Sequence, residues 1–169
     1  MLKISEKAKI SRLADIEDSV RGSEIIIADG VVIDSFVKIK PAGGTGDLSI
    51  GKNTVLNPGV VIYTGNGIVF GENVMIAANC VFSPTSHRFL SKQKPINQQG
   101  FVAPSALHGD KRGIVIEDDV MIGANCTILE GARIRKGAVI SAGSIVKGEF
   151  EEYGIYTGNP LKCIGYRRE

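Results

Sequence analysis

The sequence predicts an all-β fold in which short strands wind into a stack of about six triangular coils. Two observations predict it. An aliphatic residue recurs every six positions over much of the chain, and three positions after most of these residues stands Gly, Asn or Asp. A period of six fits neither the 3.6-residue turn of a helix nor the simple alternation of a strand. It is typical of a short strand followed by a sharp corner, and stacked coils of such units bury a continuous core.

The aliphatic positions form runs that begin near the N-terminus and become clearest in the second half. A small or apolar residue follows most of them four positions later, which completes the inward face of each unit. The runs are Ile4, Ile10, Ile16; Ile27, Ile33, Ile39; Ile50, Leu56, Ile62; Phe70, Ile76, Phe82; and Ile116, Ile122, Ile128, Ile134, Ile140, Val146.

The corner positions carry residues that tolerate a positive φ angle, where a branched side chain is strained. We therefore expect a left-handed backbone conformation at each of them. The pattern fails at Lys7, Leu13, Ser19 and Phe36. The expected corners are Gly30, Asn53, Gly59, Gly65, Asn73, Asn79, Asp119, Asn125, Gly131, Gly137 and Gly143.

Two segments interrupt the repeat within what we expect to be a single domain, residues 1–169. The shorter is the glycine-rich stretch 40–49. The longer, 88–113, has no period and is expected to be an extruded loop, with 147–169 forming a short C-terminal tail. A long excursion from a compact domain is usually functional or disordered. This one begins immediately after His87, one of only two histidines, which favours function.

Composition narrows the function classes. The 169 residues include 20 Lys+Arg and 18 Asp+Glu, so the near balance of charge argues against a nucleic-acid partner. The N-terminus has no continuous apolar segment, so we expect neither a secretory signal nor membrane insertion, and a cytoplasmic location. Three widely spaced cysteines form no C-x-x-C pair, and no metal site is expected.

Three segments resemble a known family. The repeat "GIVIEDDVMIGANCTILEGARIRKGAVISAGSIV" (113–146), the following "YTGNPLKCI" (156–164) and "SHRFLSKQKPINQQG" (86–100) resemble the hexapeptide-repeat acetyltransferases. The closest resemblance is to the galactoside, maltose and surface-polysaccharide O-acetyltransferase branch. It implies a left-handed parallel β-helix, acetyl-CoA as acyl donor, and a homotrimer with active sites at the subunit interfaces.

The same resemblance implies the catalytic residues. His87 would be the general base, and Asn57, thirty residues earlier, would orient the acceptor or help with charge. The backbone N–H of Ala124 would stabilise the oxyanion. Counting eighteen residues per coil places Asn57 and His87 on neighbouring coils, and we expect them to share one groove. A surface histidine at the start of a loop, and an ordinary corner asparagine, are the alternative interpretations.

The resemblance also implies a cofactor groove along the prism. Ala124 and Ala142 would contact the pantetheine arm, and the tail residues Gly158, Asn159, Pro160 and Lys162 would hold the nucleotide end. Two positions depart from the family. Lys147-Gly148-Glu149 stands where the family often has Thr-Lys-Asp. Gly165 stands where the family often has a basic residue, and Arg167 and Arg168 are the candidate substitutes for it. Lys147 is a further cofactor candidate, although a solvated charge is the better explanation for it.

Acceptor contacts are open to two interpretations each. Tyr63 and Phe89 are candidates for packing on a sugar ring, or they pack within loops. His108 is a candidate acceptor contact or an exposed loop residue. The basic stretch Arg133, Arg135, Lys136 is expected to form a solvated outer face rather than a phosphate site.

Three other functions stay open. The acceptor would be a saccharide or small molecule with a sugar hydroxyl, or alternatively the amino group of a nucleotide-linked amino sugar. A zinc hydratase on the same scaffold needs three imidazoles, and the chain offers two. A non-enzymatic solenoid such as an ice-binding prism would need a regular array of outward threonines, which the sequence lacks.

Overall fold

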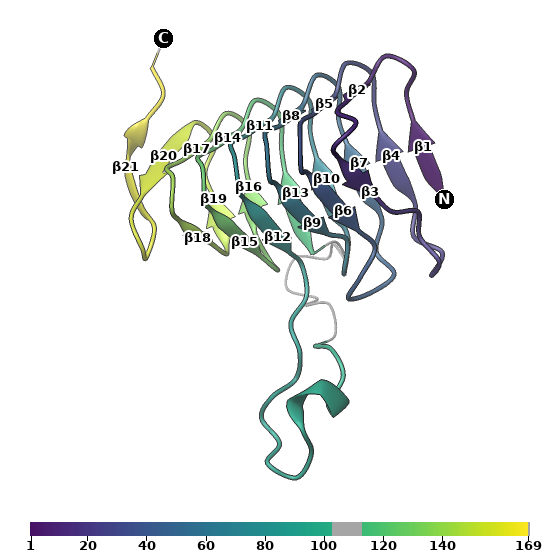
Figure 1. Cartoon of the computed structure of the whole chain (residues 1–169). Helices are drawn as coiled ribbons and strands as arrows, with labels where there is room; N and C mark the ends of the chain where they lie inside the picture. The colour runs from purple at the N-terminus through teal and green to yellow at the C-terminus, as the bar shows by residue number, and fades with distance from the viewer. Residues whose placement is uncertain (103–112, 169) are drawn as a thin grey trace.

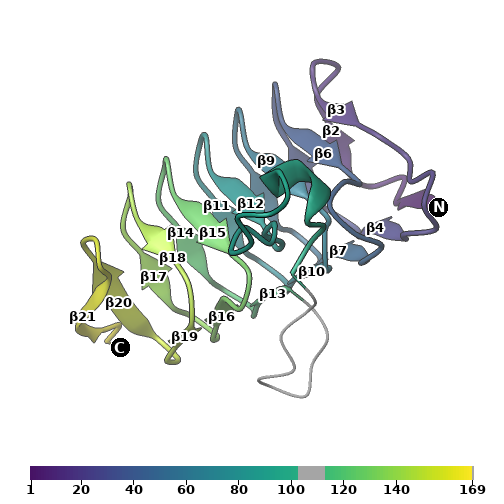
Figure 2. The same ribbon diagram turned by 90° about the horizontal axis from the view of Figure 1, so that it is seen from below.

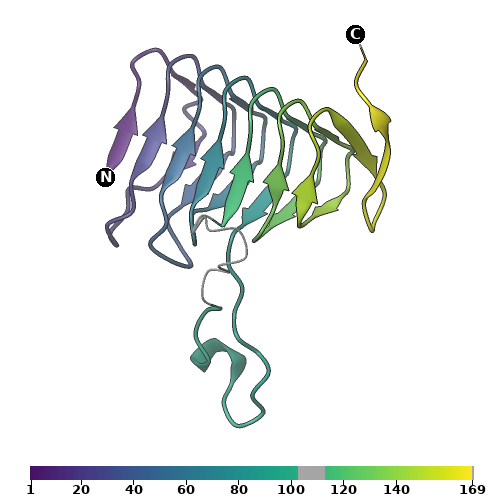
Figure 3. The same cartoon turned by 180° about the vertical axis from the view of Figure 1, so that it is seen from behind.

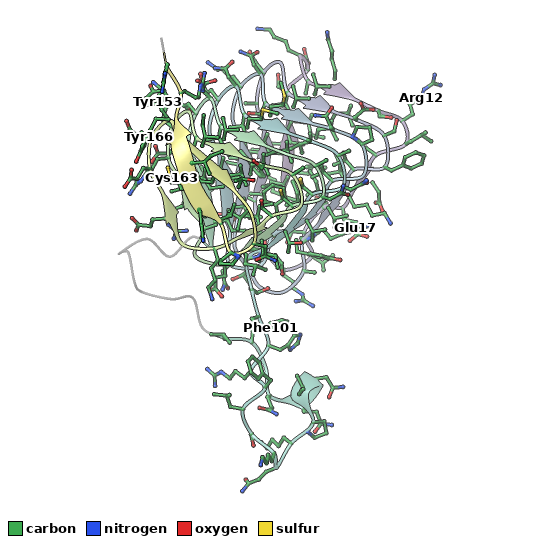
Figure 4. The ribbon with its side chains drawn as sticks, turned by 90° about the vertical axis from the view of Figure 1, so that its left-hand side faces the viewer. Arg12, Glu17, Phe101, Tyr153, Cys163 and Tyr166 are labelled. Carbon is green, nitrogen blue, oxygen red and sulfur yellow. The ribbon has the colours of Figure 1, made fainter. Side chains whose placement is uncertain are left out.

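The computed structural model describes residues 1–102 and 113–168, which form a triangular prism of stacked coils (Figure 1). It is a left-handed parallel β-helix, as predicted. Three parallel sheets make the three faces, and the coils follow one another from the N-terminal to the C-terminal end. Viewed along its axis, the prism has a triangular outline (Figure 4).

Up to β20, each sheet collects every third strand of the chain. The seven-stranded sheet contains β1 (Leu2–Ile4), β4 (Ile25–Ile27), β7 (Leu48–Ile50), β10 (Ile68–Phe70), β13 (Ile114–Ile116), β16 (Arg133–Ile134) and β19 (Glu149–Phe150). Its strands lie side by side in chain order (Figure 3). The eight-stranded sheet contains β2 (Lys9–Ile10), β5 (Val32–Ile33), β8 (Val55–Leu56), β11 (Met75–Ile76), β14 (Met121–Ile122), β17 (Val139–Ile140), β20 (Gly154–Thr157) and β21 (Lys162–Tyr166). The six-stranded sheet contains β3 (Asp15–Ile16), β6 (Lys38–Lys40), β9 (Val61–Tyr63), β12 (Val81–Ser83), β15 (Thr127–Leu129) and β18 (Ile145–Val146).

The strand register confirms the predicted aliphatic columns. Ile27 pairs with Ile50, Leu56 with Ile76, and Ile128 with Val146, so like residues stack from coil to coil. From the second coil onward these residues are buried, and they form one continuous core. A single coil could not bury this face, so each coil is stabilised mainly by its neighbours.

The corners also follow the prediction. All eleven expected corner residues have positive φ angles, from 45° at Gly65 to 86° at Gly131. Lys7 and Leu13 lack one, and there the hydroxyls of Ser5 and Ser11 accept the corner N–H groups. Phe36 adopts a φ of 62° although its side chain disfavours it.

The insertions that break the repeat all emerge where the six-stranded sheet turns into the seven-stranded sheet. They lie between β3 and β4, β6 and β7, β9 and β10, and β12 and β13. The glycine-rich stretch is one of them, and its backbone packs on the next coil, with Gly46 N–H donating to Gly65 O. The long excursion includes the 3-10 helix Ile96–Gln98 and projects well away from the prism (Figure 1). Seen from below, it lies in front of the middle coils (Figure 2).

The C-terminal segment differs from the simple tail that the sequence suggested. The part of the chain that the structure describes makes six complete turns, and β19 and β20 add two sides of a seventh. β21 then reverses and pairs antiparallel with β20. The turn at Lys147–Gly148 is short, so Phe150 follows Val146 after four residues instead of six, which hides the seventh turn from the six-residue count.

Candidate active site

The predicted site residues lie along two edges of the prism, on either side of the six-stranded sheet. We call the column of turns between the eight-stranded and six-stranded sheets the Asn57 edge, because Asn57 follows β8 there. The column between the six-stranded and seven-stranded sheets is the His87 edge, because His87 follows β12. Asn57 and His87 are on neighbouring coils, as expected, but one chain does not place them in one groove.

Asn57 is partly buried and held in one orientation. Its backbone N–H and its side-chain Nδ2 both donate to the carbonyl oxygen of Ile76 on the next coil, at 3.0 and 2.8 Å. Among the described residues nothing donates to its Oδ1. The carboxamide therefore presents an oriented acceptor that can receive a hydrogen bond from a hydroxyl or an amine.

Ala124 and Ala142 lie above Asn57 on the same edge. The N–H of Gly143 donates to Ala124 O at 2.8 Å, which ties the two coils together, whereas the N–H groups of Ala124 and Ala142 bond to no described residue. Gly123 allows the two coils to approach closely, because a Cβ at this position would lie 2.8 Å from Ala142 Cα and closer still to the Ala142 nitrogen. Small side chains and free N–H groups thus line this edge.

The tail continues the same column. Ile140 pairs with Tyr156, so Gly158 stacks over Ala142, and its φ of 90° turns the chain toward β21. Asn159 and Pro160 are joined by a cis peptide bond in this exposed turn. Lys162 begins β21 beside Thr157, is exposed, and has no ion pair within the described part of the chain. The structure therefore brings Asn57, the two alanines and the "GNPLK" turn to one edge.

His87 lies at the base of the excursion, where the two arms pair. Its backbone bridges to Phe101, with Arg88 N–H donating to Gly100 O at 2.9 Å and Val102 N–H to Ser86 O at 2.8 Å. Its imidazole stacks on the Phe101 ring, with 4.4 Å between centroids. The ring is exposed, and neither of its nitrogens bonds to a described residue. Sequence reasoning missed Phe101, because only the pairing of the two arms brings it to His87. Figure 4 shows Phe101 where the excursion leaves the prism.

The remaining substrate candidates lie on the His87 edge. Phe89, which is 62% exposed, lines with His87 a largely apolar groove of about 660 Å³ in the excursion. Tyr63 ends β9 one coil below the start of the excursion, and Lys147 follows β18, exposed, two coils above it. His108 lies outside the described residues.

Arg167 does not join the other cofactor candidates. β21 runs away from the Asn57 edge, and the Arg167 guanidinium donates to the Asp119 carboxylate at 2.8 Å and to Gly137 O at 3.1 Å. It also lies 5.9 Å from the centroid of the Tyr153 ring. These contacts are on the opposite edge of the eight-stranded sheet, where Tyr153 appears in Figure 4. The expected substitution of Arg167 for a family phosphate contact is therefore not supported.

The basic stretch after Gly131 agrees with the expected solvated face at Arg135 but not at Arg133. Arg135 is half-exposed and pairs with Glu117 at 2.8 Å, as a solvated face would have it. Arg133, in contrast, is 8% exposed and donates to Gly113 O at 3.2 Å, at the point where the long excursion returns to the prism. Gly113 N–H in turn donates to Asn66 O at 3.0 Å. Arg133 therefore anchors the returning end of the excursion.

Cys80 and Cys126 are buried on adjacent coils, as predicted for core residues. Cys80 Sγ donates to Gly123 O at 3.1 Å and Cys126 Sγ to Ser141 O at 3.2 Å. The hydrogen bond with the Cys126 sulfur, and then burial, raises the pKa of the Cys80 thiol. In the described residues no group of three His, Cys, Asp or Glu side chains gathers as metal ligands, and no helix is long and apolar enough to span a membrane.

Comparison with known proteins supports the expected family resemblance. Residues 113–147 match the model of the hexapeptide repeat of succinyl-transferase. A probable acetyltransferase of Mycobacterium tuberculosis is 30% identical over 123 residues, which cover 73% of this chain and 38% of that protein. A putative lipopolysaccharide biosynthesis O-acetyl transferase, WbbJ of Escherichia coli, is 26% identical over 80% of this chain and 65% of its own length. The chain therefore resembles the hexapeptide-repeat acetyltransferases over most of its length.

Solved structures agree on the fold. A hexapeptide-repeat acetyltransferase of Vibrio cholerae, complexed with acetyl coenzyme A, is 29% identical over 72% of this chain and 61% of its own, with a TM-score of 0.61. AntD, an N-acyltransferase of Bacillus cereus, matches 99% of this chain and 84% of its own with a TM-score of 0.78 at 22% identity. That AntD structure contains dTDP-4-amino-4,6-dideoxyglucose and coenzyme A.

Proposed function

We propose that the protein is an acetyl-CoA-dependent O-acetyltransferase that acts on a sugar hydroxyl in surface-polysaccharide biosynthesis, with His87 as general base. The observation that carries the proposal is the division of the site between two edges of one sheet. The Asn57 edge holds an oriented carboxamide and free N–H groups, and the His87 edge holds an exposed imidazole with both nitrogens unengaged. The similarity to WbbJ supports the acceptor class.

The same division supports a homotrimer with sites between subunits. His87 leaves the prism between the coil of Asn57 and the coil of Ala124. If three prisms pack side by side about a threefold axis, the His87 edge of one meets the Asn57 edge of the next at matching heights. One copy would then supply His87, Phe89 and Lys147, and its neighbour would supply Asn57, Ala124 and the tail.

The chain's own residues fit the acyl donor. The column above Asn57 offers small side chains and two free N–H groups, which suit the amides of a pantetheine arm. Lys162, exposed at the end of that column, suits a phosphate at the nucleotide end as a point charge. Gly158, Asn159 and Pro160 shape the turn between them.

The proposed reaction is a direct transfer. His87 accepts the proton of the acceptor hydroxyl as that oxygen bonds to the thioester carbonyl carbon. Asn57 Oδ1 accepts a hydrogen bond from a neighbouring hydroxyl of the same sugar, which orients the acceptor, and the N–H of Ala124 donates to the carbonyl oxygen as it becomes negative. The carbon–sulfur bond then breaks, and His87 returns its proton to the departing thiolate.

Substitution of His87 by Ala tests this function. We expect acetyl transfer to a saccharide panel, followed by release of the CoA thiol, to fall by about 10²- to 10⁴-fold, which is the usual contribution of a general base. CoA affinity by calorimetry should change little, because His87 acts on the acceptor hydroxyl, whereas the pantetheine arm is bound by backbone groups of the Asn57 edge. Unchanged turnover in the variant would exclude the mechanism, and a wild-type protein that binds no CoA would exclude the function.

An amino sugar is the second candidate acceptor. The match to AntD, whose structure contains a nucleotide-linked amino sugar, favours it through the fold. His87 could accept a proton from an amine as it does from a hydroxyl. Assay of thiol release with matched hydroxyl and amino forms of one sugar distinguishes the two acceptors.

A further inference from the structure

Phe36 occupies a corner that its side chain disfavours. It lies on the Asn57 edge with a φ of 62°, and its ring is 61% exposed. In the left-handed region a bulky side chain is strained, and such outliers often mark functional positions. On the later coils the same corner position is always Gly or Asn: Gly59, Asn79, Asn125 and Gly143.

Tyr153 provides a contrast at another edge. It also has a positive φ, of 58°, but its ring fills the space over Gly137 and lies beside the Arg167 guanidinium. Those contacts give its conformation a structural reason. The Phe36 ring makes no comparable aromatic or cation contact with any described residue. Among the described residues, no aromatic or cation contact of this kind accounts for its exposure and strain.

The surroundings of Phe36 are those of a polar ligand site. Asp34 stacks directly below Asn57, because Ile33 pairs with Leu56, and its Oδ1 accepts the N–H of Ser35 at 2.6 Å. Its second carboxylate oxygen bonds to no described residue. A carboxylate and a carboxamide on successive coils, beside an exposed aromatic ring, are suited to the hydroxyls and C–H face of a sugar.

Arg12 extends this surface by one coil. It is exposed, forms no ion pair with the described residues, and lies between β2 and β3, which is the first turn of the Asn57 edge. Figure 4 shows its side chain projecting outward from the prism. Two coil spacings separate its level from that of Asn57, which is about 10 Å. That distance accommodates one sugar ring followed by a phosphate, and a guanidinium binds phosphate oxygens with two parallel hydrogen bonds.

We infer that Arg12, Asp34 and Phe36 form an acceptor subsite for a sugar that is carried on a diphosphate. The sugar lies on Phe36 with Asp34 and Asn57 on its hydroxyls, and the diphosphate lies at Arg12. This inference rests on the proposed function, since it extends the acceptor side of the same cleft away from the pantetheine column. The carrier beyond the diphosphate is either a nucleoside or a lipid.

Calorimetry on the full chain with bound CoA tests the inference. The probes are UDP, UDP-glucose and dTDP for the nucleoside carrier, and geranyl diphosphate for the lipid carrier. We expect at least one probe to bind, and Arg12→Gln to weaken it by tenfold or more. Lys52→Gln is the matched control. It also removes one positive charge from an exposed side chain that forms no ion pair with a described residue, but it lies in the turn between β7 and β8, away from both edges of the proposed site, and should leave the affinity unchanged.

Phe36→Asn separates a binding role from a structural one. Asn tolerates the left-handed conformation, so the melting temperature should stay the same or rise. The affinity for the sugar-containing probe should fall about fivefold or more, while CoA affinity is unchanged. A lower melting temperature with unchanged probe binding would mean a structural role and overturn the inference.

Failure of this inference can be told apart from failure of the proposed function. If CoA binds and His87-dependent transfer to plain saccharides occurs but no diphosphate probe binds, the subsite is wrong and the proposed function stands. If the wild-type protein binds no CoA, the proposed function itself fails.

Discussion

Asn57 and His87 lie at opposite edges of the six-stranded sheet, on neighbouring coils of the same chain. The strands between them form one flat face of the prism, so the two side chains cannot meet across it. A site that uses both must therefore combine two copies of the chain. This relationship makes the assembly of the protein part of its proposed chemistry, and it can be tested directly.

Mixed trimers of His87→Ala and Asn57→Ala chains should recover activity. Each variant alone is expected to be nearly inactive. In a mixed trimer, one of the three interfaces pairs an intact His87 edge with an intact Asn57 edge. Random mixing at equal amounts gives about a quarter of the wild-type sites. Co-expression of differently tagged chains, followed by an acetyl-transfer assay, measures this. No recovery in isolated mixed trimers would mean that each site draws both residues from one chain.

Lys162 and Arg167 should differ in what they do. Lys162→Gln is expected to raise the KM for acetyl-CoA about tenfold with little change in kcat, since a charge-assisted contact to phosphate is lost. Arg167→Gln should leave that KM unchanged and lower the melting temperature slightly, because it breaks the contacts to Asp119 and Gly137. Steady-state kinetics and thermal melts report both effects. The reverse result would return Arg167 to the cofactor site.

Two glycines of the Asn57 edge should respond differently to substitution. Gly123→Ala is expected to destabilise the protein by about 1–3 kcal/mol, because the added Cβ collides with the Ala142 backbone. Gly143→Asn should be nearly neutral. A side chain there meets open space, and Asn occupies the same corner at Asn79 and Asn125. Thermal unfolding of both variants checks the difference, and equal losses would contradict the close approach of the two coils.

The three cysteines should separate into one reactive and two protected thiols. Cys163 is exposed, whereas Cys80 and Cys126 are buried in the core. We expect a thiol reagent such as DTNB to modify one thiol per native chain quickly, and the other two only after denaturation. Cys163→Ser should abolish the fast phase. A fast phase that remains in this variant would show that the core opens near the Cys80–Cys126 pair.

Much of the fold was predictable because its signal is local. The six-residue spacing of aliphatic residues and the Gly, Asn or Asp at each corner are set within a single coil, so each coil carries its own evidence. The seventh turn was missed because the short turn at Lys147 and Gly148 shifts the spacing, and Phe150 and Tyr156 fall out of step.

The candidate site was predictable only in part. Family resemblance supplied the residues, and the coil count placed Asn57 and His87 on adjacent coils. The count could not assign them to corners, because the insertions before His87 obscure which turn of the triangle it follows. Two further outcomes depend on contacts between residues far apart in the sequence. Arg133 is buried where it bonds to Gly113, and Arg167 is already paired with Asp119.

By itself, the sequence determined the prism, its core columns and its corners, since these follow from spacing and backbone preference within a few residues. Only the tertiary structure decided which edge each chemical group occupies and which charged side chains are already paired. Those outcomes depend on where the insertions leave the coil and on how β21 reverses. The six-residue periodicity predicts neither of them.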